Sequence, residues 1–218
     1  MRPVIALTFD DGTLKQYIVI RLFNFFGIKT TLFLTTGLIC HPHTNEPMLV
    51  AYPNKIIKLY NLGNEIASHT HTHKDLVNLN FRELMIEILA PKVFIKKLIG
   101  VSSRGFAYPY GRYNNFIRNY VLMYYEYARI YNYRYVVDRN RINFGAIDAL
   151  GIDAFKTITY LLTLILLGRK DLNNSLIILV FHSPTSLSEV LRQIVLLITL
   201  VLCKTICKAR FVRLGDIL

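Results

Sequence analysis

The sequence contains no tryptophan, only three cysteines and no apolar run long enough to cross a membrane. Cys40 stands alone, and Cys203 and Cys207 lie one helical turn apart, which is not the pattern of a secreted disulfide framework, so we expect a reducing compartment. The longest uninterrupted apolar stretches, near residues 158–167 and 194–203, fall far short of the ~20 residues that a membrane span requires. Both stretches are predicted to be buried helices.

The first residues also lack the features of an export signal. Met1-Arg2-Pro3 leads directly into the apolar residues 4–9, without the basic region, the longer apolar region and the small-residue cleavage site of a signal peptide. We therefore expect a cytoplasmic protein. At this length the chain corresponds to one domain, 1–218, which can bury roughly 70% of its unfolded surface and is not a disordered chain.

Acidic residues are scarce, because 26 Lys and Arg stand against 14 Asp and Glu and give a net charge of +12. Such a charge favours anionic partners, but here it is spread along the chain and no basic run reaches five residues. We therefore expect a generally basic surface, no nucleic-acid partner and no obligatory protein partner. A peripheral contact with a membrane face stays open.

Short apolar, β-rich runs alternate with longer segments of helical period, the pattern of repeated β-α units around a mostly parallel sheet. Strands are predicted at 4–9, 30–35, 65–68, 105–108, 133–137, 176–181 and 211–214. Helices are predicted at 14–26, 54–61, 81–98, 114–130, 155–167 and 187–204. Six or seven such units in one domain favour an α/β fold, a single-domain irregular (β/α) barrel of about seven strands that is TIM-like, with an open doubly wound sheet as the alternative.

Two of the helix starts carry capping boxes. Asn80 with Glu83, and Ser186 with Glu189, place a capping side chain three residues before a glutamate, so that two backbone donors can be satisfied reciprocally. Pro91 is expected to kink or split its helix, because proline removes one backbone donor and its ring clashes with the preceding turn.

The first polar cluster is Thr8-Phe9-Asp10-Asp11-Gly12, directly after an apolar strand. Adjacent carboxylates on an extended backbone point to different sides, so one can bind a metal while its neighbour faces a water molecule. A simple Asp-Gly turn is the other interpretation.

The second cluster, Ser68-His69-Thr70-His71-Thr72-His73, holds three of the six histidines. On an extended strand all three would face one side, whereas in a helical turn His69 and His73 would share a face. Imidazole suits zinc and its neighbours, and one carboxylate such as Asp11 would complete a three-ligand site with an open position. The cluster therefore predicts a metal site.

Two further features follow predicted strands. Phe106-Ala107-Tyr108-Pro109-Tyr110-Gly111 ends a strand in a Pro and Gly turn, and the apolar residues 176–181 deliver His182 to the same edge. A histidine at that position can carry a proton near neutral pH.

In this order, the Asp10-Asp11 motif, His69-x-x-x-His73, Tyr108-Pro109-Tyr110-Gly111 and Leu179-Val180-Phe181-His182 resemble the polysaccharide deacetylases of the NodB-homology class, carbohydrate esterase family 4. The resemblance runs from residue 4 to the end of the chain. It implies hydrolysis of N-acetyl groups on amino sugars, with an N-acetylated carbohydrate as substrate and one divalent metal ion, usually zinc, as cofactor.

The resemblance also implies the roles of individual residues. Asp11, His69 and His73 would be the metal ligands, Asp10 the base that deprotonates the attacking water, and His182 the acid that protonates the departing amine. The backbone amide of Tyr110 would help to hold the oxyanion. Leu179 would line the pocket for the acetyl methyl group, and Pro109 and Tyr110 belong to the same substrate-binding set.

The sequence departs from the family pattern at two points. Ala107 stands where the family's Arg-x-Pro-Tyr motif has the arginine that orients the base, so we expect another guanidinium, Arg141 first and Arg112 second, to reach Asp10. The family's Asp and Trp motif has no Trp here. Asp148 and Asp153 are loose stand-ins for its carboxylate.

Two other functions fit parts of the sequence. A barrel that has lost catalysis could bind glycans or nucleic acid through residues 129–135, where charge alternates with aromatic rings. Another metal-dependent amidohydrolase would also place His-x-His at a strand end, although normally on the first strand. The survival of Asp10, Asp11, His69, His73 and His182 favours the deacetylase.

Overall fold

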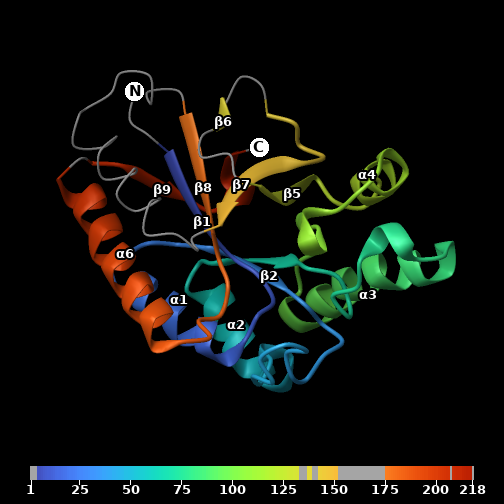
Figure 1. Ribbon diagram of the computed structural model, residues 1–218, viewed down its shortest axis with the longest axis horizontal. Coiled ribbons are helices and arrows are strands. Elements are labelled where there is room, and N and C mark those ends of the chain that lie inside the picture. The colour runs from blue at the N-terminus through green and yellow to red at the C-terminus, as the bar shows by residue number, and fades with distance from the viewer. Residues whose placement is uncertain (1–3, 133–136, 139–141, 152–174, 207, 218) are drawn as a thin grey trace.

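A computed structural model describes residues 4–132, 137–138, 142–151, 175–206 and 208–217. Seven parallel strands follow one another around a ring in the order β1-β2-β3-β4-β5-β7-β8. β8 pairs back onto β1, and these two strands lie side by side in Figure 1. These strands are β1 Val4–Phe9, β2 Thr31–Leu34, β3 Glu65–Ser68, β4 Gly105–Ala107, β5 Tyr127–Asn132, β7 Ile147–Gly151 and β8 Ser175–Phe181. The ring is closed, so the predicted irregular barrel is confirmed and the open sheet is wrong.

Two short strands make the barrel irregular. β6, Val137–Asp138, runs antiparallel beside the start of β8, while β7 pairs with the end of β8. β9, Arg210–Val212, lies parallel to the start of β1, while β2 pairs with the end of β1. At β1 and β8, the ring of seven strands is therefore paired continuously only toward their carboxyl ends, because β9 and β6 pair with their amino-terminal parts.

Alternation of side chains separates two apolar layers. Val4 and Ala6 of β1 belong to a cluster made by strand residues and the chain's last segment, which is the barrel interior. Ile5, Leu7 and Phe9 join a second cluster with residues of α1, α2 and α6, which lies between barrel and helices. By the same alternation, Asp10 continues the inward-facing row of β1.

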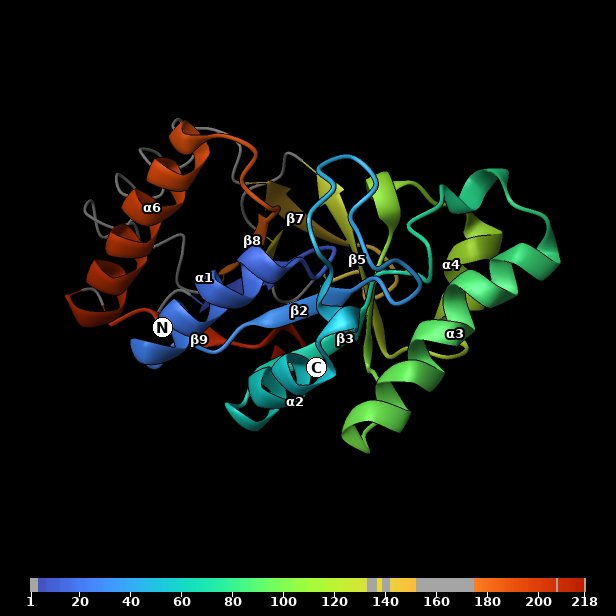
Figure 2. The same ribbon diagram turned by 90° about the horizontal axis from the view of Figure 1, so that it is seen from below.

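The helices surround the barrel (Figure 2). They are α1 Leu14–Phe25, α2 Pro53–Asn61, α3 Phe81–Ile99, α4 Asn115–Leu122 and α6 Leu187–Thr205. Five of the predicted helices thus correspond to observed ones, and the sixth, 155–167, lies outside the described residues. The strand predicted at 133–137 also falls largely outside them.

The predicted capping boxes and the predicted break at Pro91 agree with the structure except at two points. Asn80 and Glu83 form the reciprocal capping box, but at α6 Ser186 accepts the Glu189 amide while the Glu189 carboxylate accepts the amide of Thr185. α3 is not split at Pro91, which is buried inside a continuous helix. Tertiary context overrides the low helix propensity of a buried proline there.

The predicted helix 114–130 is wrong beyond Leu122. α4 ends there, and Tyr127–Asn132 forms β5, with Tyr127 facing the barrel interior and Ala128 facing the α3 and α4 side. This period of two identifies a strand, but it follows the helix after only four residues, so the two patterns merge in the sequence. β7 was not predicted at all.

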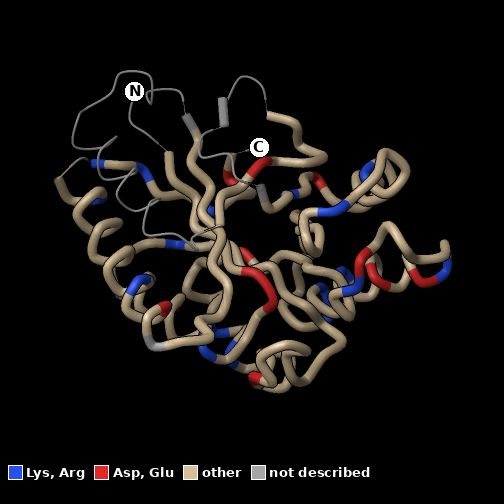
Figure 3. Tube along the Cα trace, in the orientation of Figure 1, with Lys and Arg blue, Asp and Glu red and all other residues tan. Residues whose placement is uncertain are grey.

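α6 is not a buried helix, contrary to the prediction for 194–203. Leu196 and Leu200 are buried against the barrel, whereas Val195 and Ile198 are exposed on the other face. No helix among the described residues has both the length and the apolar character to cross a membrane. Lys and Arg are scattered along the described chain from α1 to β9 (Figure 3).

Replacing Leu179 tests whether its side chain belongs to the apolar layer between barrel and helices. Its side chain is fully buried in the cluster between barrel and helices, so Leu179→Ala should lower the free energy of unfolding by about 2–5 kcal/mol. Ile198→Ala, on the exposed face of α6, should change it by no more than about 0.5 kcal/mol. Urea denaturation measures both. Near-normal stability of the Leu179 variant would contradict its place in the core.

Candidate active site

The polar motifs meet at one end of the barrel, where the carboxyl ends of the seven parallel strands form what we call the carboxyl rim. Asp10 and Asp11 follow β1, His69 follows β3, Tyr108 follows β4 and His182 follows β8. A cavity of about 380 Å³ opens there. Its lining includes Asp10, Asp11, His41, His69, His73, Tyr108, Tyr110, Tyr131, His182 and Ser183.

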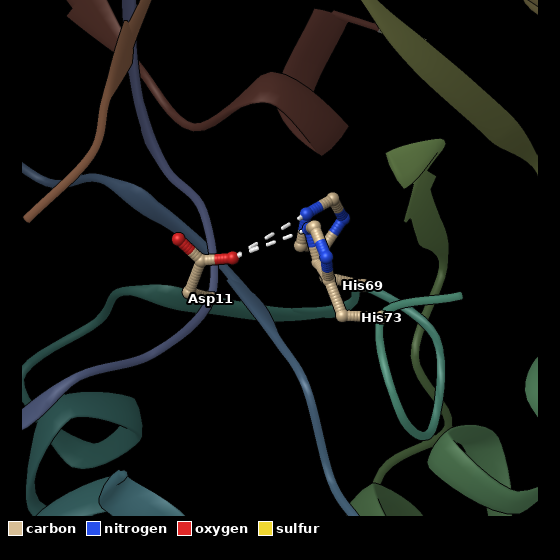
Figure 4. Close-up of side chains that lie close together, drawn as sticks. All are labelled: Asp11, His69 and His73. Atoms are coloured by element: carbon tan, nitrogen blue, oxygen red, sulfur yellow. Dashed lines mark ion pairs between the residues drawn. The ribbon is translucent and has the colours of Figure 1, made fainter. Parts of the chain in front are cut away.

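Asp11, His69 and His73 converge on one point (Figure 4). Asp11 Oδ1 lies 3.7 Å from His69 Nε2 and 3.5 Å from His73 Nε2, and the three ligand atoms lie within 4.8 Å of one another. Ligand atoms around a tetrahedral ion with bonds of about 2.0–2.1 Å are themselves roughly 3.3–3.5 Å apart. The three side chains therefore fit one divalent metal ion.

The protonation of His69 also suits a metal ligand. Its Nδ1 lies 2.9 Å from the carbonyl oxygen of Ala107 and donates to it, which leaves the lone pair on Nε2 directed at Asp11. His71 faces elsewhere, since its Nδ1 lies 3.1 Å from the Thr36 hydroxyl. The histidine cluster thus divides into a converging pair and one neighbour outside it.

The backbone adopts left-handed conformations at the rim. Asp11, Thr70, His73 and Tyr110 all have positive φ, of 75°, 66°, 59° and 58°. Such conformations cost free energy for residues with a side chain and persist only where the surroundings enforce them. The fold therefore enforces these conformations, and this is why neither simple strand nor simple helix geometry described 69–73.

Glu87 of α3 binds the backbone of the loop that carries the histidines, residues 69–73. Its buried carboxylate accepts the backbone amides of His71 and Thr72, at 2.9 and 2.7 Å, and also the Thr72 hydroxyl. Because buried amides without acceptors are costly, this contact fixes the turn that presents His73. Nothing in the sequence singled out Glu87, since a glutamate in an amphipathic helix is ordinarily solvent-exposed.

Burial and neighbouring charges determine the ionisation of the ligands. Burial opposes the charge on Asp11, but His41 and the imidazoles of His69 and His73 outweigh it, so the pKa of that carboxyl lies below its ordinary range. Burial and the neighbouring His69 lower the pKa of His73 from 6.5 to about 4. Both residues are therefore deprotonated at neutral pH, the state that metal ligands require.

Asp10 forms the second centre of the rim. Its Oδ1 accepts from Nη2 of Arg129, which is fully buried, and its Oδ2 lies 3.8 Å from His182 Nε2. Burial opposes the charge on Asp10, but Arg129, His69 and His182 outweigh it and lower its pKa below the ordinary value. Asp10 is therefore an oriented carboxylate that is available to accept a proton.

The arginine that reaches Asp10 comes from β5. Arg129 is the register partner of Ala107 on the neighbouring strand, and the small Ala107 side chain leaves room for the guanidinium inside the barrel. Arg141, the predicted source, lies outside the described residues. Arg112, the second choice, pairs instead with Asp75 at 2.6 Å.

The sequence prediction missed Arg129 because it assigned this segment to a helix end. Arg129 lies between Tyr127 and Tyr131 with a spacing of two, a charge inside an inward-facing row of large side chains. That pattern was the available signal. Only the alternative of a barrel without catalysis uses residues 129–135, as a binding stretch, whereas Arg129 is fully buried.

The remaining predicted residues fall in different places. Tyr110 lines the cavity, with its ring 4.9 Å from that of His73, and it lies in a single 3-10 turn, Pro109–Gly111, in which Pro109 is buried. Leu179 is not among the cavity residues, because alternation along β8 turns it toward the helices. Asp148 lies on β7, and Asp153 is outside the described residues.

Comparison with known proteins identifies the family. The model of the polysaccharide deacetylase family matches residues 1–127. The chain belongs to this family, carbohydrate esterase family 4. A curated relative, the probable peptidoglycan-N-acetylglucosamine deacetylase of Arthroderma benhamiae, is 30% identical over 89 residues, which are 40% of this chain and 19% of the relative. The chain spans between 18% and 36% of the length of the curated deacetylases it matches.

Solved deacetylase-family structures share the fold. The Xyl-CE4 domain of a multidomain xylanase from the hindgut metagenome of Trinervitermes trinervoides superposes with a TM-score of 0.63 at 21% identity, covering 100% of this chain and 90% of that one. The family 4 acetyl xylan esterase of Clostridium thermocellum, solved with a cobalt ion, gives 0.62 at 16% identity over 98% and 89%. These likenesses concern the barrel alone.

The Asp10–Arg129 contact predicts the effect of moving the arginine. Arg129→Ala leaves a buried carboxylate unpaired and should lower the free energy of unfolding by about 3–5 kcal/mol. Because Ala107 is its register partner, adding Ala107→Arg should recover part of that loss. Urea denaturation of both variants measures this. If Arg129→Ala alone unfolds like the wild type, the pair is not what stabilises Asp10.

The pKa of His73 predicts how the metal-free protein responds to acid. Between pH 6.5 and about 4 the unfolded chain binds a proton at His73 that the folded chain does not, so stability should fall as the pH falls and level off below about 4. Over that range the free energy of unfolding of the wild type should fall by on the order of 3 kcal/mol, and this fall should be absent in His73→Gln, with both proteins measured in the presence of a chelator. Identical pH profiles for the two proteins would contradict the lowered pKa.

Proposed function

We propose that this chain hydrolyses N-acetyl groups of amino sugars. The observation that carries the proposal is the content of one cavity: an Asp-His-His ligand set, an oriented buried carboxylate and a histidine 3.8 Å from it. Amide hydrolysis needs an activated water, stabilisation of charge on the carbonyl oxygen and a proton for the amine. The chain belongs to a family named for the deacetylation of polysaccharides, which supports the proposal.

The ligand set would be Asp11, His69 and His73. When bound there, a divalent metal ion supplies Lewis-acid polarisation of the carbonyl and acidification of a water molecule. Zinc suits two imidazoles and a carboxylate, and we propose it as the native ion. His182 is not part of this ligand set, since the converging ligand group within the described chain comprises only these three residues.

Asp10 would take the proton from the attacking water. Arg129 holds Oδ1, which leaves Oδ2 directed into the cavity toward His182. A base must be oriented as well as ionised, because proton transfer requires a short and aligned contact. The water oxygen then adds to the acetyl carbon, and the backbone amide of Tyr110 donates to the carbonyl oxygen as negative charge develops on it.

His182 would supply the proton for the leaving group. The carbon–nitrogen bond breaks, the amine nitrogen takes a proton from Nε2, and the products are acetate and the free amine. The His182 side chain is 42% exposed, so the sugar can approach it from solvent. Between turnovers Asp10 would give its proton to water and His182 would take one up from water, because their side-chain atoms lie 3.8 Å apart, beyond a direct hydrogen bond.

We propose an N-acetylglucosamine-containing glycan or glycolipid as the substrate. Tyr108, Tyr110 and Tyr131 line the cavity, and aromatic rings suit the apolar faces of sugars. The relatives' names specify peptidoglycan or xylan for those proteins. The alternative of a barrel without catalysis is disfavoured by the buried Arg129, which serves Asp10 rather than a binding surface. The cytoplasmic location stays a prediction.

Replacing single residues separates the roles. Asp10→Asn and His182→Ala should each lower kcat for acetate release by about 10²–10⁴ while the protein still binds one metal ion, because neither residue is a ligand. Asp11→Ala should lose the metal together with activity. Acetate released from a panel of N-acetylated oligosaccharides and the metal content of the purified protein provide the measurements.

Two outcomes would overturn these assignments. If Asp10→Asn loses metal as completely as Asp11→Ala, the division between base and ligand is wrong. If the metal-loaded wild type releases no acetate from any N-acetylated sugar but binds such sugars, the chain is a binding protein.

A further inference from the structure

His41 contacts the ligand carboxylate on the side away from the other histidines. Its Nε2 lies 3.5 Å from Asp11 Oδ2, whereas His69 and His73 face Oδ1. We propose that His41 is a positioning residue: it holds Oδ2 so that Asp11 presents Oδ1 alone to the metal, and it thereby raises metal affinity. This inference rests on the metal site of the proposed function.

The hydrogen bonds of the ring determine which nitrogen carries the proton. Nδ1 of His41 accepts from the backbone amides of His43 and Thr44, at 3.3 and 3.2 Å, and lies 3.1 Å from the Thr44 hydroxyl. A neutral imidazole has one acceptor and one donor nitrogen, so Nε2 carries the hydrogen. His41 therefore faces Asp11 as a donor, and that nitrogen has no lone pair to offer a metal.

The segment that carries His41 is ordered by its own backbone bonds. The His41 amide donates to the Glu46 carbonyl at 2.8 Å, the His41 carbonyl accepts from Asn45 at 2.9 Å, and Met48 donates to Ile39 at 2.9 Å. The His41 side chain is only 11% exposed. The donor is thus in place before any ligand arrives, which is the condition for orienting a carboxylate at little entropic cost.

Fixing Oδ2 matters because a carboxylate can rotate and exchange its two oxygens. Without His41, Oδ1 and Oδ2 could alternate before His69 and His73, and the ligand set would be less organised. Outer partners of metal ligands typically contribute 10–100-fold to metal affinity. The sequence indicated nothing of this, because His41 follows β2 by seven residues, outside every motif that pointed to chemistry.

The test compares three variants of the full chain with Zn²⁺ and Co²⁺ as probes. His41→Ala should weaken metal affinity by about 10–100-fold in competition with a chromophoric chelator. His41→Gln should bind close to the wild-type value, since the Gln amide nitrogen can donate to Oδ2 although it gives up the loop contacts of Nδ1. His43→Ala is the matched control, because this exposed neighbour meets the His41 ring and should leave metal affinity unchanged.

Three results would overturn the proposal. If His41→Ala binds metal with wild-type affinity, His41 has no positioning role. If His41→Gln binds metal as weakly as His41→Ala, the effect comes from the loop contacts of Nδ1 instead. If the visible spectrum of the Co²⁺-loaded protein shows a different coordination number in His41→Ala than in the wild type, His41 is a ligand. A wild-type protein that binds no metal would refute the metal site itself, which distinguishes that failure from the failure of His41 alone.

Discussion

Closure of the ring between β1 and β8 is the constraint on which the active site depends. Six residue pairs join these strands, from Val4 with Leu176 to Phe9 with Phe181, and the Thr8 hydroxyl donates to the Leu179 carbonyl at 3.0 Å. All seven strands are parallel, so closure brings every carboxyl end to one rim. The same pairing sets Asp10 beside His182, residues from opposite ends of the chain.

The rim concentrates ionisable groups, and its two carboxylates, Asp10 and Asp11, are buried beside oppositely charged or hydrogen-bonding side chains. Arg129 offsets the burial of Asp10, and three imidazoles surround Asp11. In a region of low dielectric such contacts strongly favour the charged carboxylates, while an unpaired charge would be expensive. Organisation of the site and stability of the barrel are therefore coupled through the same side chains.

The arginine on β5 shows that the guanidinium beside Asp10 comes from the strand next to the one that carries Ala107. Ala107 and Arg129 are register partners that face the same interior, and the Arg129 guanidinium reaches the carboxylate at the end of β1. What the chemistry requires is a planar donor at one point in space.

The sequence by itself determined the β-α alternation, the strands at 4–9 and 65–68, and the aspartate and histidine motifs, because hydrophobic period and motif spacing are local properties. Only the tertiary structure decided that the ring closes, that 127–132 is a strand, that Leu179 faces the helices, and that Arg129, Glu87 and His41 lie beside Asp10, the 69–73 loop and Asp11. These features depend on strand register and on contacts between distant segments. A one-residue shift in a strand reverses the face of every side chain, and no local pattern records which partner lies across the sheet.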